Sequence, residues 1–313
     1  MGETANIRHL THAEIDKEKW DACVDSADNG LIYGYSIYLN HMAKHWDGLV
    51  ISKKSSKNEY TAVMPLIWNK KYGITYCYQP PFMQQSGIFG NLEENNLKLF
   101  FKKVISFVRY GDWMFNYQNR FINSLYPAHI MTNLIIDLKA GYDNIWDNYN
   151  RDLLENLKKA EKQPIFYVSN DNLNDTIDRY KYYYERRTPH VKAKGYEDFN
   201  GLCLHLMRNN QCLIREAKDD NGNLLASVLL LKDKRRLYNI MNTTTEAGRK
   251  TEANHFLIDH IIREFAGQSF LLDLEGSDLP GIKKFYEKFG AVNQPYYHLH
   301  YNNLPLLLRI IKK

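Results

Sequence analysis

The chain has 313 residues, of which 44% are hydrophobic and 25% are charged. This composition is that of a globular protein, and the length favours two domains. The net charge of +5 comes from 41 basic and 36 acidic residues spread along the chain, without the block of like charge that marks a nucleic-acid-binding arm. An anionic small substrate is compatible with this charge.

Neither a signal segment nor a membrane span is expected. The first ten residues, MGETANIRHL, have no basic region followed by an apolar run. No stretch reaches the roughly 18 apolar residues that a membrane span needs. Cys23, Cys77, Cys203 and Cys212 have no C-x-x-C spacing and suit buried free thiols. We therefore expect a cytoplasmic protein.

The first half of the chain combines helical and strand patterns, read from apolar spacing of three to four residues or of two. The expected helices span residues 12–27, 35–46 and 97–108. The expected strands span residues 7–10, 48–54, 60–70, 72–79 and 113–118. This half ends near Pro127, so we predict an N-terminal domain over 1–128 and a C-terminal domain over 129–313.

The second half contains the same kinds of element. Its expected helices span residues 145–160, 176–187 and 252–266, and the segment from Tyr184 to Tyr196 is expected to be a loop. Its expected strands span residues 132–138, 165–170, 212–218, 224–233, 237–245 and 269–275.

The two halves share one antiparallel meander. The segment from Leu49, LVISKKSSKNEYTAVMPLIWNKKYGITY, can be placed without gaps above LIREAKDDNGNLLASVLLLKDKRRLYNI from Leu213, and their turns coincide. Alternating strands share some of this pattern by chance, but coincident turns are harder to obtain. The sequence therefore indicates a tandem duplication.

The order of meander, helix, strand and helix resembles the GNAT fold of N-acyltransferases. The residues that carry the resemblance run from Leu237 to Ala291 and end in FYEKFGA, which is similar to the YEKxGF signature of many GNAT enzymes. The resemblance implies two tandem GNAT-like domains of the α/β (α+β) class, with mixed, mostly antiparallel sheets.

A two-domain chain of this kind resembles the Fem-type aminoacyltransferases of peptidoglycan synthesis and the related BioF-like and Fem-like acetyltransferases. The segment from Asn150 to Asn170 is similar to the family's R-x-x-I-x-K-A-E-K-x-G-V pattern, and the segment from Asp273 to Gly290 to its D-x-x-G-S … G-L-x-x-F-K-x-x-F-G pattern. Tyr286 stands where the Fem pattern has a lysine, which favours a thioester donor over aminoacyl-tRNA.

Three residues are candidates for the chemistry of acyl transfer, which needs a base for the amine and an acid for the leaving group. Tyr286 lies where GNAT enzymes often place a general acid, and its alternative role is a packing aromatic. Glu275, and to a lesser degree Asp273, end a strand where a carboxylate can reach an amine. Their alternative roles are a salt bridge or a cap of the Gly276 turn.

The resemblance also implies a binding site for acyl-CoA between the strand that ends near Thr244 and the strand that ends near Glu275. GNAT enzymes bind the pyrophosphate on backbone amides of a glycine-containing loop at a helix start. Here the loop has no central glycine, and Glu252 is either a carboxylate near the phosphate position or an acidic residue at the helix start. The residues expected to contact the donor are Asn242, Thr243, Thr244, Arg249, Lys250, Thr251 and Asn254.

A basic segment lies between Tyr184 and Tyr196. Arg186, Arg187, Lys192 and Lys194 suit recognition of a carboxylate or phosphate on the acceptor, with a solvated face as the alternative. His41 and His45 lie four residues apart, but without a nearby third ligand we expect no metal.

These observations predict an N-acyltransferase that moves an acyl group from acyl-CoA to a small-molecule amine or peptide. Two alternatives stay open. One is a Fem-type enzyme of cell-wall peptide synthesis that uses aminoacyl-tRNA, which Tyr286 makes less favoured. The other is a GNAT-fold binding protein without catalysis.

Overall fold

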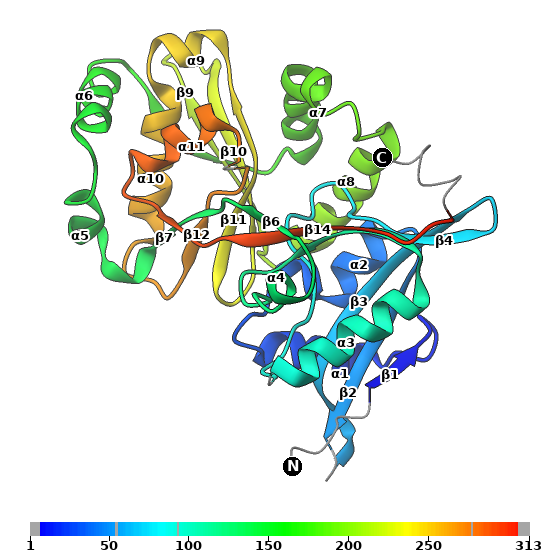
Figure 1. Ribbon diagram of the computed structural model, residues 1–313. Coiled ribbons are helices and arrows are strands. Elements are labelled where there is room, and N and C mark those ends of the chain that lie inside the picture. Colours follow the sequence, from blue (N-terminus) through cyan, green and yellow to red (C-terminus); the bar gives the residue numbers. More distant parts are fainter. Residues whose placement is uncertain (1–6, 54–55, 93, 277, 306–313) are drawn as a thin grey trace. The chain divides into compact units, whose positions relative to one another are not determined.

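The structure is a computed structural model that describes residues 7–53, 56–92, 94–276 and 278–305 (Figure 1). The chain forms two compact units. Unit 1 comprises Met1–Met131 together with the segment that begins at Pro295, and unit 2 comprises Thr132–Gln294. Each unit contains one seven-stranded mixed sheet, which confirms the predicted α/β class with two GNAT-like domains.

Unit 1 has the strand order β1-β2-β3-β4-β5-β14-β6. Its strands are β1 (Ile7–Leu10), β2 (Trp46–Lys53), β3 (Ser56–Lys71), β4 (Ile74–Cys77), β5 (Tyr110–Phe115), β6 (His129–Met131) and β14 (Tyr296–Asn302). Its helices are α1 (Lys17–Ser26), η1 (Ile32–Gly34), α2 (Ser36–Met42), α3 (Glu94–Phe107) and α4 (Ile122–Leu125). The apolar side of α3 packs through Phe100, Phe101 and Val104 on a core that includes alternate residues of β2 and β3.

Unit 2 has the strand order β13-β7-β12-β11-β10-β9-β8. Its strands are β7 (Leu134–Asp137), β8 (Phe166–Asn170), β9 (Cys212–Lys218), β10 (Leu224–Lys232), β11 (Arg236–Thr244), β12 (Leu271–Asp273) and β13 (Val292–Asn293). Its helices are η2 (Leu138–Ala140), α5 (Tyr142–Trp146), α6 (Arg151–Ala160), α7 (Leu173–Tyr184), η3 (Glu185–Arg187), α8 (Ala193–Met207), α9 (Glu246–Lys250), α10 (Ala253–Phe265) and α11 (Pro280–Glu287).

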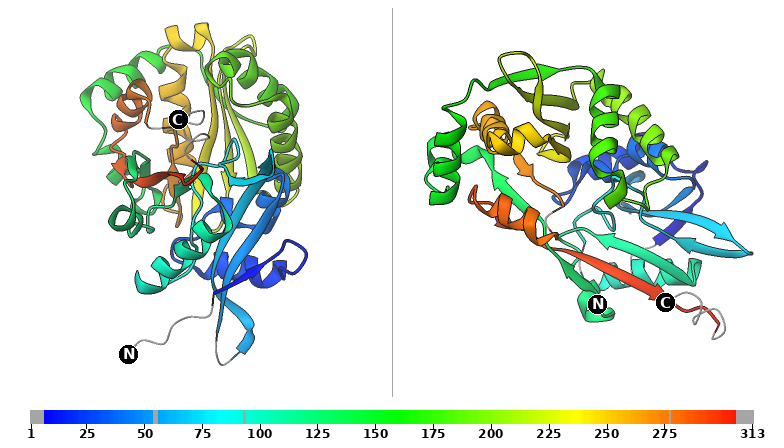
Figure 2. Two further views of the ribbon diagram at one scale, coloured as in Figure 1. Left: turned by 45° about the vertical axis from the view of Figure 1, so that its right-hand side comes forward. Right: turned by 90° about the horizontal axis from the view of Figure 1, so that it is seen from above.

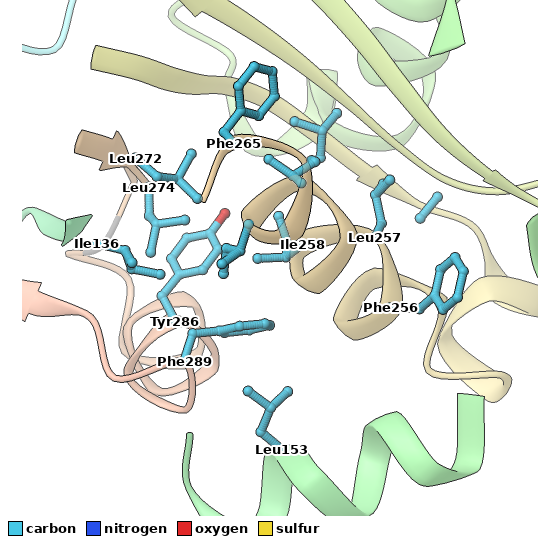
Figure 3. Close-up of a cluster of buried hydrophobic side chains, with 14 of the residues drawn as sticks. Ile136, Leu153, Phe256, Leu257, Ile258, Phe265, Leu272, Leu274, Tyr286 and Phe289 are labelled. Atoms are coloured by element: carbon cyan, nitrogen blue, oxygen red, sulfur yellow. The ribbon is translucent and has the colours of Figure 1, made fainter. Parts of the chain in front are cut away.

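The helices of unit 2 cover both faces of its sheet. Helices α6, α10 and α11 lie on one face, and α7 and α8 lie on the other (Figures 1 and 2). The first face is covered by a cluster of buried apolar side chains, which include residues of α6, α10 and α11 (Figure 3) and four residues of β10, namely Leu225, Ala226, Val228 and Leu230. Such burial contributes about 25 cal/mol for each Å² of apolar surface, so this cluster holds the helices on the sheet.

Two adjacent strands of unit 2 separate after a short parallel contact. Arg236, Leu237 and Tyr238 of β11 pair with Leu271, Leu272 and Asp273 of β12. The rest of β11, up to Thr244, pairs only with β10 among the described residues. Beyond Tyr238, the backbone of β11 therefore makes no ladder hydrogen bonds to the described part of the segment that follows β12.

Several predicted elements differ from the structure. The helix expected over 145–160 is two helices, because the side chain of Asn150 accepts a hydrogen bond from the Leu153 amide and starts α6 anew. Helix α8 was not predicted, and α9 occupies part of an expected loop. The division after residue 128 stays a prediction. The compact units differ from it at the C-terminal end, because β14 pairs with β5 and β6 of unit 1.

Candidate active site

Tyr286 lies in the interior of unit 2, on α11. Its side chain is 5% exposed, and its ring packs among Leu274, Ile258 and Phe289 (Figure 3). The Asn239 Nδ2 donates a hydrogen bond of 2.9 Å to its Oη. Burial raises the pKa of the phenol above its usual range, although the amides of Asn242 and Asn239 oppose the shift. Tyr286 is therefore a core aromatic whose hydroxyl is neutral at pH 7 and meets polar groups.

Glu275 lies at the exit of β12, in a strained backbone. Its φ is 42° and that of Gly276 is 57°, and both values lie in the left-handed region. Non-glycine residues in this region cost roughly 1–3 kcal/mol and concentrate at functional sites. Burial raises the pKa of the half-buried Glu275 carboxyl well above its usual range, and its charge in turn raises the pKa of Tyr286. The two groups are thus electrostatic neighbours.

Two asparagines of β11 border Tyr286. Asn239 is 4% exposed, and its Oδ1 has no hydrogen-bond partner. The Nδ2 of Asn242 is likewise buried without a partner. A buried polar atom without a partner costs about 1–3 kcal/mol, so such atoms are rare outside functional sites.

Asp273 is completely buried in an ion pair. Its Oδ2 lies 3.0 Å from Nη1 of Arg236, which is 2% exposed, and Nη2 of Arg236 donates to Gln294 Oε1 at 2.7 Å. Burial raises the pKa of Asp273, and Arg236 opposes the shift. The ion pair links β11 to β12 where the two strands still pair, which is the salt-bridge alternative considered for this residue. Its catalytic role stays a prediction.

The loop after β11 is a short helix with a close packing contact. Thr245 caps α9 by accepting from the Gly248 amide at 2.9 Å. A Cβ on Gly248 would lie 2.0 Å from the Leu225 carbonyl oxygen, so this glycine permits α9 to approach β10. Gly248 therefore allows α9 to pack on β10.

Several side chains expected to contact the donor have local partners. Arg249 Nη1 donates to the Thr244 carbonyl at 2.9 Å, and Lys250 Nζ lies 3.0 Å from Glu246 Oε1. Thr251 Oγ1 donates to the Ala247 carbonyl at 3.1 Å. The exposed ion pair of Lys250 is worth little, so that lysine can change partner at small cost.

Two further residues expected at the donor site are Thr243 and Asn254. Thr243 is 1% exposed, so its side chain is inside the unit. Asn254 lies in the first turn of α10, and its buried Oδ1 has no hydrogen-bond partner. Their contact with a donor stays a prediction.

Glu252 starts α10 and turns toward His255. It is the N-cap residue, with φ 58°, and its Oε2 lies 2.9 Å from His255 Nδ1. Burial lowers the pKa of His255 to about 4, so the ring is neutral at pH 7. The structure thus places a carboxylate at the start of α10, as the helix-start interpretation predicted.

The basic segment is exposed, and Tyr184 at its start acts electrostatically on Tyr286. Arg186 and Arg187 lie in η3, and Lys192 and Lys194 lie at the start of α8, all exposed. The expected loop is therefore partly helical. The Arg187 guanidinium carbon lies 5.8 Å from the centroid of the Tyr184 ring, and Tyr184 in turn raises the pKa of Tyr286. Lys194 pairs with Asp198 at 2.6 Å.

Of the residues around Tyr286, Asn239 contacts its hydroxyl, and Glu275 and Tyr184 raise its pKa. Asn239 and Tyr184 are not among the site residues predicted from the sequence. Asn239 had a signal, because it is a polar residue in an apolar strand. Among the described residues, no group of three or more His, Cys, Asp or Glu side chains is arranged to hold a metal ion. In the same part of the chain, no helix is long and apolar enough to cross a membrane.

Comparisons with known proteins concern the domain family and the fold. Residues 148–280 match the model of the acetyltransferase (GNAT) domain family. The fold is similar to that of FemX, with a TM-score of 0.69 and 12% identity over 98% of this chain and 100% of that one. A conserved protein of unknown function from Bacteroides thetaiotaomicron gives a TM-score of 0.59 and 10% identity over 96% and 100% of the two chains.

A further similar structure is L-PGS from Bacillus licheniformis, with a TM-score of 0.51 and 12% identity over 95% of both chains. No curated protein sequence matches the chain. At these identities the structural matches show the fold alone, and the match to the family model covers less than half of the chain.

Proposed function

We propose that the chain is a Fem-like acyltransferase of the GNAT fold, and that its unit 2 transfers the acyl group of an acyl-CoA thioester to an amine. The observation that carries the proposal is the buried Tyr286 hydroxyl, which accepts a hydrogen bond from Asn239 and whose pKa is raised by the charge of Glu275 at the exit of β12.

The groups near Tyr286 suit the proton transfers of this reaction. The amine nitrogen attacks the thioester carbon and forms the C–N bond, while Glu275 takes a proton from the amine. Its raised pKa makes this carboxylate, in its ionised form, a stronger base than an exposed one. The C–S bond then breaks, and Tyr286 gives its proton to the departing thiolate. Net proton movement from Glu275 through solvent restores the phenol.

The start of α10 is the proposed site for the donor's pyrophosphate. This helix has 13 residues, and the N–H groups of its first turn favour an anion. Lys250 and Arg249 lie in the preceding α9 and add positive charge. Glu252 opposes binding, because its carboxylate lies at the same helix start.

The acceptor is proposed to be an amine that also carries a carboxylate, as amino acids and peptides do. The Arg187 guanidinium carbon lies 5.8 Å from the centroid of the Tyr184 ring, and Tyr184 raises the pKa of Tyr286, so a carboxylate bound by Arg187 would hold its amine near the reacting atoms. Arg186 and Lys192 are exposed in the same segment and reinforce its positive field.

The Glu252 carboxylate also favours a second candidate donor, aminoacyl-tRNA, whose ester needs no pyrophosphate at this position. The same catalytic groups would serve that reaction, with the ribose hydroxyl as the leaving group. The third candidate function is that of a GNAT-fold binding protein without catalysis.

The test combines binding and turnover on the full chain. Acetyl-CoA and longer acyl-CoAs are expected to raise the unfolding midpoint, because a ligand of the native state stabilises it by mass action. Release of free CoA thiol is expected to depend on an added amino acid or peptide. A shift with charged tRNA but with no acyl-CoA would replace the proposal by the second candidate. A shift with an acyl-CoA and no transfer to any amine would favour the binding protein.

A further inference from the structure

We propose that Asn239 and Asn242 form an amide pair that acts directly in acyl transfer: Asn242 binds the carbonyl oxygen of the acyl group, and Asn239 positions Tyr286 and holds the attacking amine. The inference rests on the proposed function and assigns the polar groups that this function still needs. These are a donor for the oxyanion and an acceptor for the second N–H of the amine.

A β-bulge brings the two asparagines to one face of β11. Asn239 is opposite Leu230, Met241 is opposite Leu229, and Asn242 is opposite Val228, so Ile240 is an extra residue on β11. Side chains alternate along a strand with a period of two, and a regular strand would send residues 239 and 242 to opposite faces. The extra residue restores them to one side, because Leu230 and Val228 share a face.

That face is the one that carries Tyr286. Leu230 and Val228 belong to the buried cluster that also contains Tyr286, Leu272 and Leu274. The hydrogen bond of 2.9 Å from Asn239 to the Tyr286 Oη confirms that Asn239 points there. Asn242 is opposite Val228, so its side chain lies on the same face of β11 as that of Asn239.

The unused atoms of the pair match the needs of the reaction. Tyr286 Oη accepts from Asn239, so its own proton is free to be donated to the leaving thiolate. The buried Nδ2 of Asn242 is a donor without a partner, and it suits the carbonyl oxygen as negative charge develops there. The buried Oδ1 of Asn239 is an acceptor without a partner, and it suits the amine N–H that Glu275 does not take.

A structural role for these amides predicts the opposite effect on stability. If Asn242 only braced the fold, the substitution Asn242→Leu would lower the unfolding midpoint. If its Nδ2 awaits substrate, Leu removes a buried unpaired donor at similar volume, and the midpoint of the ligand-free protein is expected to rise by about 2–4 °C. Ser227→Ala is the matched control. Ser227 is 2% exposed with an unpaired Oγ, and it lies one position from Val228, on the other face of β10.

Measurements of kcat test the roles of Asn242 and Asn239. Asn242→Leu is expected to lower kcat about 10²–10³-fold with little change in KM for the donor, as loss of one oxyanion donor does. Asn239→Leu is expected to lower kcat about 100-fold through misplacement of Tyr286. Ser227→Ala is expected to keep the wild-type kcat. Unchanged kcat in Asn242→Leu, or an equal loss in Ser227→Ala, would refute the pair.

The leaving group tests the role of Asn239. A p-nitrothiophenyl ester of the same acyl group has a far more acidic thiol and needs no general acid. The defects of Asn239→Leu and Tyr286→Phe are expected to shrink together on this donor, whereas the Asn242→Leu defect persists because the oxyanion still forms. A defect of Asn239→Leu that is equal on both donors would contradict its positioning of Tyr286.

Failure of the proposed function would look different. In that case the wild-type protein would release no thiol from any thioester with any amine. The midpoints of Asn242→Leu and Ser227→Ala would still decide about the pair, since a fall for Asn242→Leu refutes it and a rise supports it without any turnover.

Discussion

The neutral state of His255 leads to a prediction about stability in acid. This residue lies in α10, is 7% exposed, and is 2.9 Å from Glu252 through its Nδ1. Its pKa is lowered to about 4, first by burial and then by the nearby Lys288 and Lys159, whereas Asp152 opposes the shift. The unfolded chain binds a proton to this histidine near its ordinary pKa of about 6.5.

The direction and size of the effect follow from these two values. Between about pH 6.5 and pH 4 the unfolded state holds the proton and the folded state does not, so stability falls as the pH falls through this window. Above pH 6.5 both states are neutral, and the full contribution is present. A pKa about 2.5 below the ordinary value corresponds to about 3 kcal/mol of unfolding free energy.

Urea unfolding at about pH 7.5 and pH 4.5 measures this contribution. The full chain is compared with His255→Gln, which keeps an amide donor for Glu252 and does not titrate. Protonation of carboxylates changes the unfolding free energy of both proteins, so the difference between their two pH-dependent losses isolates the contribution of His255. The wild-type protein is expected to lose about 2–3 kcal/mol more than the variant on acidification. An equal loss in the two proteins, or a wild type that gains stability relative to the variant, would refute the burial argument.

Three other substitutions test separate parts of the account. Gly248→Ala is expected to destabilise the protein by about 1–3 kcal/mol in urea unfolding, because its Cβ would meet the Leu225 carbonyl oxygen at 2.0 Å, and wild-type stability would contradict this packing. Asp273→Asn leaves the buried charge of Arg236 without its counter-charge, so a loss of about 3–5 kcal/mol is expected, and a loss below about 1 kcal/mol would show that the pair is dispensable. Glu252→Gln removes a negative charge at the start of α10, so the KM for acyl-CoA is expected to fall several-fold, and an unchanged KM would place the pyrophosphate elsewhere.

Much of the fold could be read from the sequence because its elements have strong local patterns. The strands of both meanders and helix α10 lie where alternation and three- to four-residue spacing placed them. Helix α8 was missed although Phe199, Leu202, Cys203 and Leu206 have helical spacing and are buried. The Gly195 and Pro189 nearby favoured a loop over this pattern.

The site could be predicted only in part, for reasons that depend on tertiary structure. The resemblance selected Tyr286, Glu275 and Asn242, but strand alternation gives no reason to group Asn239 with Asn242. The bulge at Ile240 that brings them together depends on the register with β10. Likewise, the Asp273 carboxylate could be assigned to an ion pair only once Arg236 was known to lie beside it.

The most direct test of the central claim is the rate of CoA release from an acyl-CoA in the presence of an amine acceptor, measured for the wild-type protein and for Tyr286→Phe. The account predicts amine-dependent release by the wild type and a kcat about 10²–10⁴-fold lower in the variant, which retains the ring in the core but loses the proton donor. Amine-dependent release at the wild-type rate by Tyr286→Phe would contradict it.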